Sequence, residues 1–325
     1  MSAQNLPKSA RDYQRDHRLE ISAAVTALNR AWRRMGPDFD GSWNAGVGTQ
    51  VERVLVTGQQ RVINRTRRYV PDVLAETGQT RAVTAFAETS SVPLLGVAGD
   101  GRPVESLSYG AVVRSKQAIA LGATVPQALE AGRKFLSLAG GTALADTARQ
   151  QMSLELGTRH VGGYIRMITP PSCSRCLVLA GQWYRKNTGF ERHPGCLCVH
   201  VPASESMSTD LRVNPHAYFD SLPMSEQDRI FTKAGAEAIR NGADISQVVN
   251  ARRGMTRSQS GRLIRDERGL YTTTEGMTRR GWAYQQQRSY RKHGPVQARL
   301  MPESILEIAK NQDDYVRLLR LYGYM

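Results

Sequence analysis

Cysteine is absent from most of this 325-residue chain, because all four cysteines lie between positions 173 and 198. No apolar run reaches the roughly eighteen residues that a membrane-spanning helix needs, so we expect no membrane span. The first residues contain no apolar h-region, so we expect neither a secretory signal nor a disulfide-forming compartment. The patterns G-x-x-x-x-G-K and G-x-S-x-G are also missing, which removes the usual signatures of a phosphate loop and of a serine hydrolase.

The four cysteines form two closely spaced pairs. Cys173 and Cys176 have the C-x2-C spacing with which two thiolates bind one ion from a tight turn. The second group is H-x2-C-x-C, made by His193, Cys196 and Cys198. Tetrahedral Zn²⁺ takes four Cys or His ligands in this kind of arrangement, so the sequence predicts a metal site with five candidates for four positions. Two disulfides, a redox-active C-x2-C pair and inert buried cysteines are the alternatives.

We expect this Zn²⁺ to be structural rather than catalytic. A catalytic zinc usually has three protein ligands, an open position for water and a carboxylate base nearby. Here ligands are in excess, and the nearest acid, Glu191, is predicted to lie on a loop rather than in an H-E-x-x-H helix. A short segment buries little core by itself, and a metal can replace that burial. His200 would continue the strand face shared by Cys196 and Cys198, which makes it a weaker alternate ligand.

Positive charge dominates the composition, with a formal net charge of +15. Such a balance favours a polyanionic partner, and nucleic acid before a membrane, although a generally basic surface would have the same composition. Residues 251–299 contain eleven Arg and one Lys against three acids, interleaved with Tyr and Trp. This mixture is typical of a segment that contacts phosphates and stacks on bases, or of a flexible linker. The residues predicted to contact nucleic acid are Arg252, Arg253, Arg257, Arg262, Arg265, Arg279, Arg280, Arg288, Arg291 and Lys292.

The first 160 residues are predicted to be helical. A helix capped by Ser9 should end at Gly36-Pro37, and a second should run from about residue 50 to residue 70, where Pro71 interrupts it. The first helix has an apolar stripe that either packs on the second helix or docks on a partner. The stripe consists of Ile21, Val25, Leu28, Trp32 and Met35.

Further helices are expected between residues 105 and 156, with a start at Thr124-Val-Pro126 and a break at Ala139-Gly-Gly141. After these helices the sequence predicts three short strands, as in a small zinc ribbon. Helices return after residue 214 and again at the end of the chain. The expected strands are 164–169, 181–184 and 197–202, and the expected later helices are 225–241, 244–249 and 301–322.

Several stretches carry a recognisable combination of motifs. C-x2-C is followed by L-x-G-Q-W-Y and by H-P-G-C-L-C, and residues 218–242 and 248–255 add two further segments. Together they resemble the phage Mu protein F-like minor head proteins, in the versions carried by tailed phages of actinobacteria. The specific match covers roughly residues 160–255. The N-terminal half is similar mainly in being helical.

The resemblance implies a virion protein, present in few copies inside the phage head near the portal vertex and acting in head morphogenesis. The implied partners are the portal protein, the scaffold or major capsid protein, and packaged double-stranded DNA bound without sequence preference, with no membrane. The implied location is the virion, after assembly in the host cytoplasm. DNA contact agrees with the basic composition, which is an independent observation. We therefore expect a structural minor capsid protein rather than an enzyme.

Two enzymatic alternatives remain. Some actinophage relatives are described as capsid maturation proteases or protease fusions, in which case His160, His200 or His216 would have to pair with a serine in space. A nuclease-like enzyme is the other alternative, because C-x2-C knuckles also brace compact nuclease folds. Against the nuclease alternative, the sequence shows no His-rich or acid-rich metal centre that could hydrolyse a phosphodiester.

The expected fold class is α+β and predominantly helical, in four regions. Residues 1–160 form a helical N-terminal region, and residues 161–255 a Mu F-like domain with a Cys/His metal site and a small zinc-ribbon-like β segment. Residues 256–300 form a basic, partly flexible segment, and residues 301–325 a helical C-terminal tail.

Overall fold

The computed structural model confirms a predominantly helical α+β protein, with 63% of its residues in helices. It describes residues 6–168, 172–189, 193, 195–196, 198–207, 214–255, 263–290 and 295–325. The chain divides into two compact units. The N-terminal unit comprises Ala3–Thr169 and Gly181–Arg212, and the C-terminal unit comprises Met1–Ser2, Pro170–Ala180 and Val213–Met325. No helix in the described part of the chain is long and apolar enough to cross a membrane.

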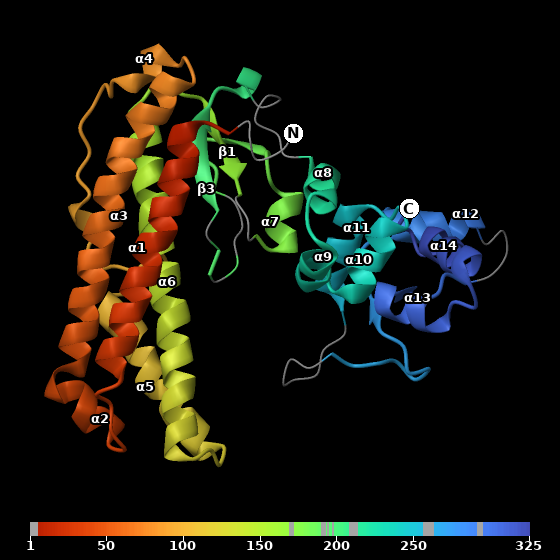
Figure 1. Cartoon of the computed structure of the whole chain (residues 1–325), viewed down its shortest axis with the longest axis horizontal. Coiled ribbons are helices and arrows are strands. Elements are labelled where there is room, and N and C mark those ends of the chain that lie inside the picture. Colours follow the sequence, from red (N-terminus) through yellow and green to blue (C-terminus); the bar gives the residue numbers. More distant parts are fainter. Residues whose placement is uncertain are drawn as a thin grey trace. The chain divides into compact units, whose positions relative to one another are not determined.

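Four long helices make up most of the N-terminal unit, and α1, α3 and α6 pack against one another (Figure 1). They are α1 (Lys8–Trp32), α3 (Gly48–Glu76), α5 (Val104–Ala120) and α6 (Val125–Gly157). The start of α6 agrees with the prediction, because Thr124 and Gln127 form a capping box there. The short elements of this unit are α2 (Phe39–Ser42), η2 (Trp43–Val47), α4 (Thr80–Val83), η3 (Val92–Leu94) and η4 (Glu205–Met207).

The apolar stripe of α1 packs inside its own unit, so the interpretation of this helix as a docking arm is wrong. Leu28 is completely buried and Trp32 is 3% exposed. The indole N–H of Trp32 donates to the carbonyl oxygen of Leu129 in α6 at 2.9 Å. The alternative prediction, that the stripe packs on the helix over residues 50–70, agrees with the structure, because Leu28 shares a buried cluster with Val51 and Leu55 of α3.

The Gly-Gly pair predicted to break α6 lies inside a continuous helix. A Cβ atom added to Gly140 would lie 2.5 Å from Cδ1 of Leu28. This glycine therefore permits close packing of α6 on α1. The helix continues through it because the tertiary contact outweighs the roughly 1 kcal/mol that glycine costs in a helix.

Pro71 does not interrupt α3, which runs on to Glu76. A proline in a helix interior removes one hydrogen bond and costs about 3 kcal/mol. The residues around it, Val70, Val73 and Leu74, are completely buried. Each such side chain contributes about 1.5–3 kcal/mol when buried, so the helix is favoured despite the proline.

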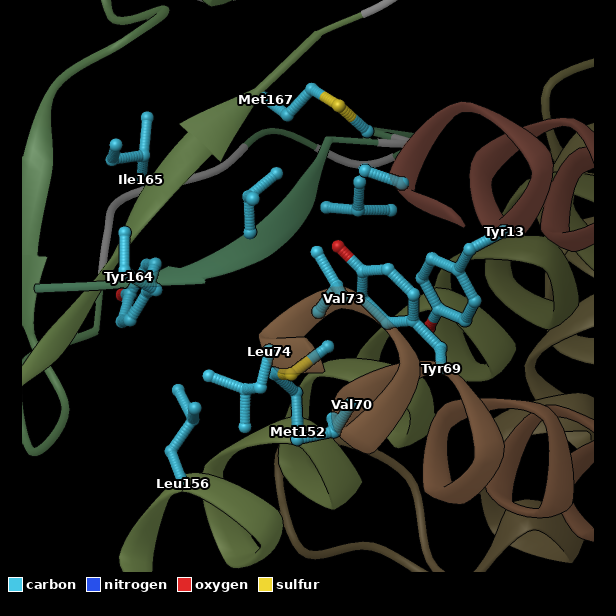
Figure 2. Close-up of a cluster of buried hydrophobic side chains, with 14 of the residues drawn as sticks. Tyr13, Tyr69, Val70, Val73, Leu74, Met152, Leu156, Tyr164, Ile165 and Met167 are labelled. Atoms are coloured by element: carbon cyan, nitrogen blue, oxygen red, sulfur yellow. The ribbon is translucent and has the colours of Figure 1, made fainter. Parts of the chain in front are cut away.

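The three expected strands are present, displaced by one or two residues. They are β1 (Gly163–Met167), β2 (Trp183–Arg185) and β3 (Val199–Ala203), which form an antiparallel sheet in the order β2-β1-β3. Figure 2 shows side chains of β1, including Tyr164, in one cluster with Tyr13 of α1 and Tyr69 of α3. The rings of Tyr13 and Tyr69 stack with centroids 4.0 Å apart. The sheet is therefore anchored on the helices of its own unit.

The described part of the C-terminal unit consists of short helices and a two-stranded sheet. Its helices are α7 (Ser174–Val178), α8 (Pro215–Asp220), α9 (Met224–Phe231), α10 (Lys233–Arg240), α11 (Ile245–Ala251), η5 (Arg252–Gly254), α12 (Trp282–Tyr290), α13 (Pro302–Ile308) and α14 (Gln312–Leu321). The antiparallel strands β4 (Thr272–Thr273) and β5 (Arg299–Leu300) form a two-stranded sheet. The predicted helix at 244–249 is present as α11, where the Asp244 side chain accepts from the N–H of Gln247.

The single helix expected over residues 225–241 is instead two helices, α9 and α10. Thr232 separates them with φ 65° and ψ 157°, a left-handed conformation that is rare for a β-branched residue. Its hydroxyl accepts from the N–H of Gly235 at 3.3 Å and thereby caps α10. Thr232 also accepts from the guanidinium of Arg252 at 2.6 Å. These contacts compensate for the strained backbone, and no local sequence pattern indicates them.

Candidate metal centre

The first cysteine pair is arranged by the short helix α7. Cys173 is the N-cap of this helix, and its Sγ accepts from the N–H of Cys176 at 3.4 Å. Cys176 lies in the helix itself and is buried, as is Leu177. A cap that faces back into the first turn keeps both sulfur atoms at the same end of the helix, which is the geometry expected of a C-x2-C ligand pair.

The second cysteine pair lies on a turn that precedes β3. Gly195 has φ 75°, and the N–H of Cys196 donates to the carbonyl oxygen of His193 at 3.1 Å. The N–H of Gly195 donates to the hydroxyl of Thr142 in α6 at 2.9 Å. Because β3 begins only at residue 199, Cys196 and Cys198 do not share a strand face, contrary to expectation. Both thiols are buried although neither cysteine lies in the strand.

The ligand atoms of the five predicted candidates gather into two overlapping groups. Those of Cys173, Cys176 and His193 all lie within 4.8 Å of one another, and so do those of Cys176, Cys196 and Cys198. Cys176 belongs to both groups. None of the four cysteines forms a disulfide in this structure, in contrast to the disulfide alternative. Thiolate and imidazole are the donors that Zn²⁺ prefers in structural sites, so this cluster could bind a metal ion.

A buried arginine lies against the second cysteine pair. Arg166 is in the middle of β1 and is 1% exposed. Its Nη2 lies 3.8 Å from Sγ of Cys196 and 3.7 Å from Sγ of Cys198. A guanidinium is costly to bury unless anionic or strongly dipolar groups face it. Two sulfur atoms that carry negative charge when they bind metal are suitable partners for this cation.

A second arginine holds the backbone of the same turn. The guanidinium of Arg149, on α6, donates to the carbonyl oxygens of both Cys196 and Cys198, the latter at 3.2 Å from Nη2. Its Nη1 also donates to Asp146 at 2.8 Å. The side chain of Arg149 is 13% exposed. Neither arginine was predicted as a site residue, since each lies more than twenty residues from the cysteines it contacts and no spacing rule connects them.

His200 is part of the core rather than of either ligand group in the described part of the chain. Its ring stacks on Tyr164 with centroids 3.8 Å apart. Burial, reinforced by the charges of Arg149 and Arg166, lowers the pKa of His200 to about 3, so the ring is neutral at physiological pH. The other two histidines considered for a protease lie at the surface, where His160 packs on Phe86 and His216 follows the cap of α8.

The ten residues predicted to contact nucleic acid have different surroundings. Arg252 pairs with Glu303. Arg265 pairs with Glu307 at 2.9 Å, and its Cζ lies 4.5 Å from the ring centroid of Tyr271. Arg253 is exposed. Four of the ten lie outside the described residues: Arg257, Arg262, Arg291 and Lys292.

The remaining three predicted residues are associated with α12. Arg288 is exposed on this helix, and Arg279 and Arg280 are exposed in the turn that leads into it. Two aromatic side chains of the same helix are also accessible, Trp282 with 52% and Tyr290 with 49% exposure. We call these five residues the α12 surface. It combines cations with exposed rings, as a nucleic-acid contact would require.

Comparison with known proteins supplies no relative from which the role of the metal centre or of the α12 surface could be transferred. No protein-family model, no curated protein and no solved structure matches the chain.

Proposed function

We propose that the Cys/His segment, residues 173–198, binds one structural Zn²⁺. The support is the gathering of its cysteine and histidine ligand atoms within 4.8 Å in two groups that share Cys176. Full occupation of the ion by four protein ligands leaves no position for a reactive water. The role of the metal is then to stabilise the fold, as expected for a region with little apolar core.

The metal proposal is tested by elemental analysis of protein purified without chelator. We expect about one equivalent of zinc, and its loss in Cys176→Ser because that residue belongs to both ligand groups. Ser174→Ala, a change in the same short helix that removes no ligand, is the matched control. Less than about a tenth of an equivalent in the unaltered protein, with all four thiols freely titratable, would overturn the proposal.

We further propose that the chain is a minor capsid protein of a tailed phage that acts in head morphogenesis at the portal vertex. The supporting observation is that the motifs similar to the Mu F-like proteins coincide with the cysteine cluster, so the resemblance involves the residues that the fold brings together. In this role the protein is located inside the head, after assembly in the host cytoplasm. Its partners are the portal protein and the scaffold or major capsid protein.

Packaged double-stranded DNA is the proposed polyanionic partner, and the α12 surface is its proposed contact. Arg279, Arg280 and Arg288 are exposed, whereas Arg252 and Arg265 are ion-paired within the protein. An arginine that is already paired gains less from a phosphate than a solvated one does. Contact through phosphates implies binding without sequence preference.

Head assembly from co-expressed portal, scaffold, major capsid protein and this chain tests the role. We expect the chain to co-purify with the heads in few copies and to be absent from heads assembled without portal. Heads that form with portal but exclude the chain would overturn the proposal. Specific shortening of the scaffold or of the major capsid protein, dependent on this chain, would instead identify it as the maturation protease.

A further inference from the structure

The central strand of the sheet contains a charged residue where an apolar one is expected. Arg166 pairs with His200 of β3 in the strand register, and its N–H donates to the carbonyl oxygen of Gln182 at 3.1 Å. The carbonyl oxygen of Arg166 accepts from the N–H of Gly181 at 2.9 Å. The backbone of this residue is thus fixed from both sides, and all five residues of β1 are buried. Burying an unpaired guanidinium costs free energy, so we expect a specific partner for the side chain of Arg166.

The sulfur atoms of Cys196 and Cys198 are such a partner. Both lie within 3.8 Å of the same nitrogen, Nη2 of Arg166. One donor group shared between two sulfur atoms holds them next to each other. A metal that carries three or four thiolates has a net negative charge, and a buried cation beside it offsets that charge.

Arg149 acts on the same pair through the backbone. It reaches the carbonyl oxygens of both cysteines from α6 and so constrains the backbone at Cys196 and at Cys198. Its own orientation is set by the ion pair with Asp146, whose side chain is 7% exposed. Arg166 and Arg149 therefore constrain different atoms of one turn.

We infer that Arg166 and Arg149 are positioning residues of the metal centre, which hold Cys196 and Cys198 in a binding geometry before the ion arrives. Arg166 orients the two sulfur atoms and balances their charge, whereas Arg149 sets the backbone that presents them. The inference rests on the proposed metal site. Outer contacts of this kind typically change metal affinity by about 10- to 100-fold when they are removed.

The test compares the metal affinity of full-length variants by competition with a chromogenic chelator. We expect Arg166→Met to weaken Zn²⁺ binding by about 10- to 100-fold. Arg166→Lys, which keeps the charge but not the planar guanidinium, should weaken Zn²⁺ binding less. Arg149→Met should weaken binding through the backbone. Arg185→Met removes an exposed arginine from β2 of the same sheet and is the matched control, with no expected change.

A spectroscopic readout separates positioning from general loss of structure. With Co²⁺ in place of Zn²⁺, the thiolate charge-transfer and d–d bands of the Arg166 variants should shift, whereas those of Arg185→Met should not. Circular dichroism of the metal-free proteins identifies variants that fail to fold, and Arg166→Lys then takes the place of Arg166→Met. Equal affinity and an unchanged Co²⁺ spectrum in folded Arg166 and Arg149 variants would overturn this inference alone. Failure of the unaltered protein to bind either ion would overturn the metal proposal as well.

Discussion

The guanidinium of Arg299 lies over the ring of Tyr324, with Cζ 4.2 Å from the ring centroid, and both side chains are completely buried. Arg299 also donates to the carbonyl oxygens of Tyr322 and Gly323, both at 2.9 Å. The hydroxyl of Tyr324 donates to the carbonyl oxygen of Leu300 at 2.9 Å. The end of the chain is therefore a core element of the C-terminal unit, which satisfies a buried cation through backbone dipoles and an aromatic face.

Deleting residues 322–325 should destabilise the C-terminal unit strongly. The deletion removes two carbonyl acceptors and the stacked ring and leaves the Arg299 cation buried with fewer partners, which typically costs about 3–5 kcal/mol. Urea unfolding followed by circular dichroism measures the destabilisation. Deleting Met325 alone, which removes none of these partners of Arg299, is the control. A four-residue deletion that unfolds at the same urea concentration as this control would contradict the role assigned to Arg299.

Two adjacent glycines in α6 should respond to alanine in opposite directions. A Cβ on Gly140 would lie 2.5 Å from the Leu28 side chain, whereas a Cβ on Gly141 would meet Ile21 and Val25 at an ordinary 3.5 Å. Gly140→Ala should therefore destabilise the protein by about 1–3 kcal/mol through overpacking. Gly141→Ala should stabilise it by about 0.5–1 kcal/mol through helix propensity. Thermal unfolding of both variants measures the difference, and shifts of the same sign would refute the packing argument.

The substitution Trp32→Asp should abolish folding of the N-terminal unit. Trp32 is 3% exposed and hydrogen-bonded to Leu129, so the substitution buries an unpaired charge and opens a cavity. We expect the free energy of unfolding to fall by more than about 4 kcal/mol, measured by urea unfolding. Leu19→Asp, on the same helix at a position that is 63% exposed, is the matched control and should change stability little. Retained helicity and stability in Trp32→Asp would revive the docking interpretation of α1.

Acid should destabilise the N-terminal unit through His17. Burial, with the charges of Arg149, Arg65 and Arg18, lowers the pKa of His17 to about 3 from the ordinary value of 6.5. The folded state thus keeps this ring neutral while the unfolded chain takes up a proton below pH 6.5. Its stabilising contribution is present above pH 6.5 and falls by about 1.4 kcal/mol per pH unit as the pH drops toward 3.

His17→Phe should therefore unfold with a shallower dependence of stability on pH between 4 and 6. The free energy of unfolding, measured by urea titration at several pH values, gives the slope for each protein. The same substitution at exposed His216 tests whether removing any histidine has this effect. An identical slope in His17→Phe and the unaltered protein would show that His17 does not take up the proton on unfolding.

Neutralising the α12 surface should weaken DNA binding and its dependence on salt. The triple change of Arg279, Arg280 and Arg288 to Ala removes three exposed cations. The slope of log K against log salt should then become shallower by about 0.9 for each phosphate that the variant no longer neutralises. Fluorescence anisotropy with duplexes of unrelated sequence measures both quantities. Arg265→Ala is the control, because that arginine is paired with Glu307. Salt-insensitive or sequence-selective binding would contradict recognition through phosphates.

Local sequence alone determined the helical character of the N-terminal half, the start of α6 at Thr124 and the cap of α11 at Asp244. Apolar periodicity and capping depend on residues within one or two turns, so they can be read directly from the chain. Local sequence also predicted the first ligand pair, because the C-x2-C spacing of Cys173 and Cys176 is by itself typical of a metal site.

Where rules based on local sequence give the wrong structure, contacts between residues far apart in the sequence decide the outcome. α3 continues through Pro71 and α6 through Gly140 because distant side chains bury the surrounding residues, which outweighs propensities of a few kcal/mol. Thr232 divides a predicted helix because its hydroxyl has partners at residues 235 and 252. Arg166 acquires its place beside the cysteines in the same way, since the partners of a buried charge are set by strand register and not by sequence spacing.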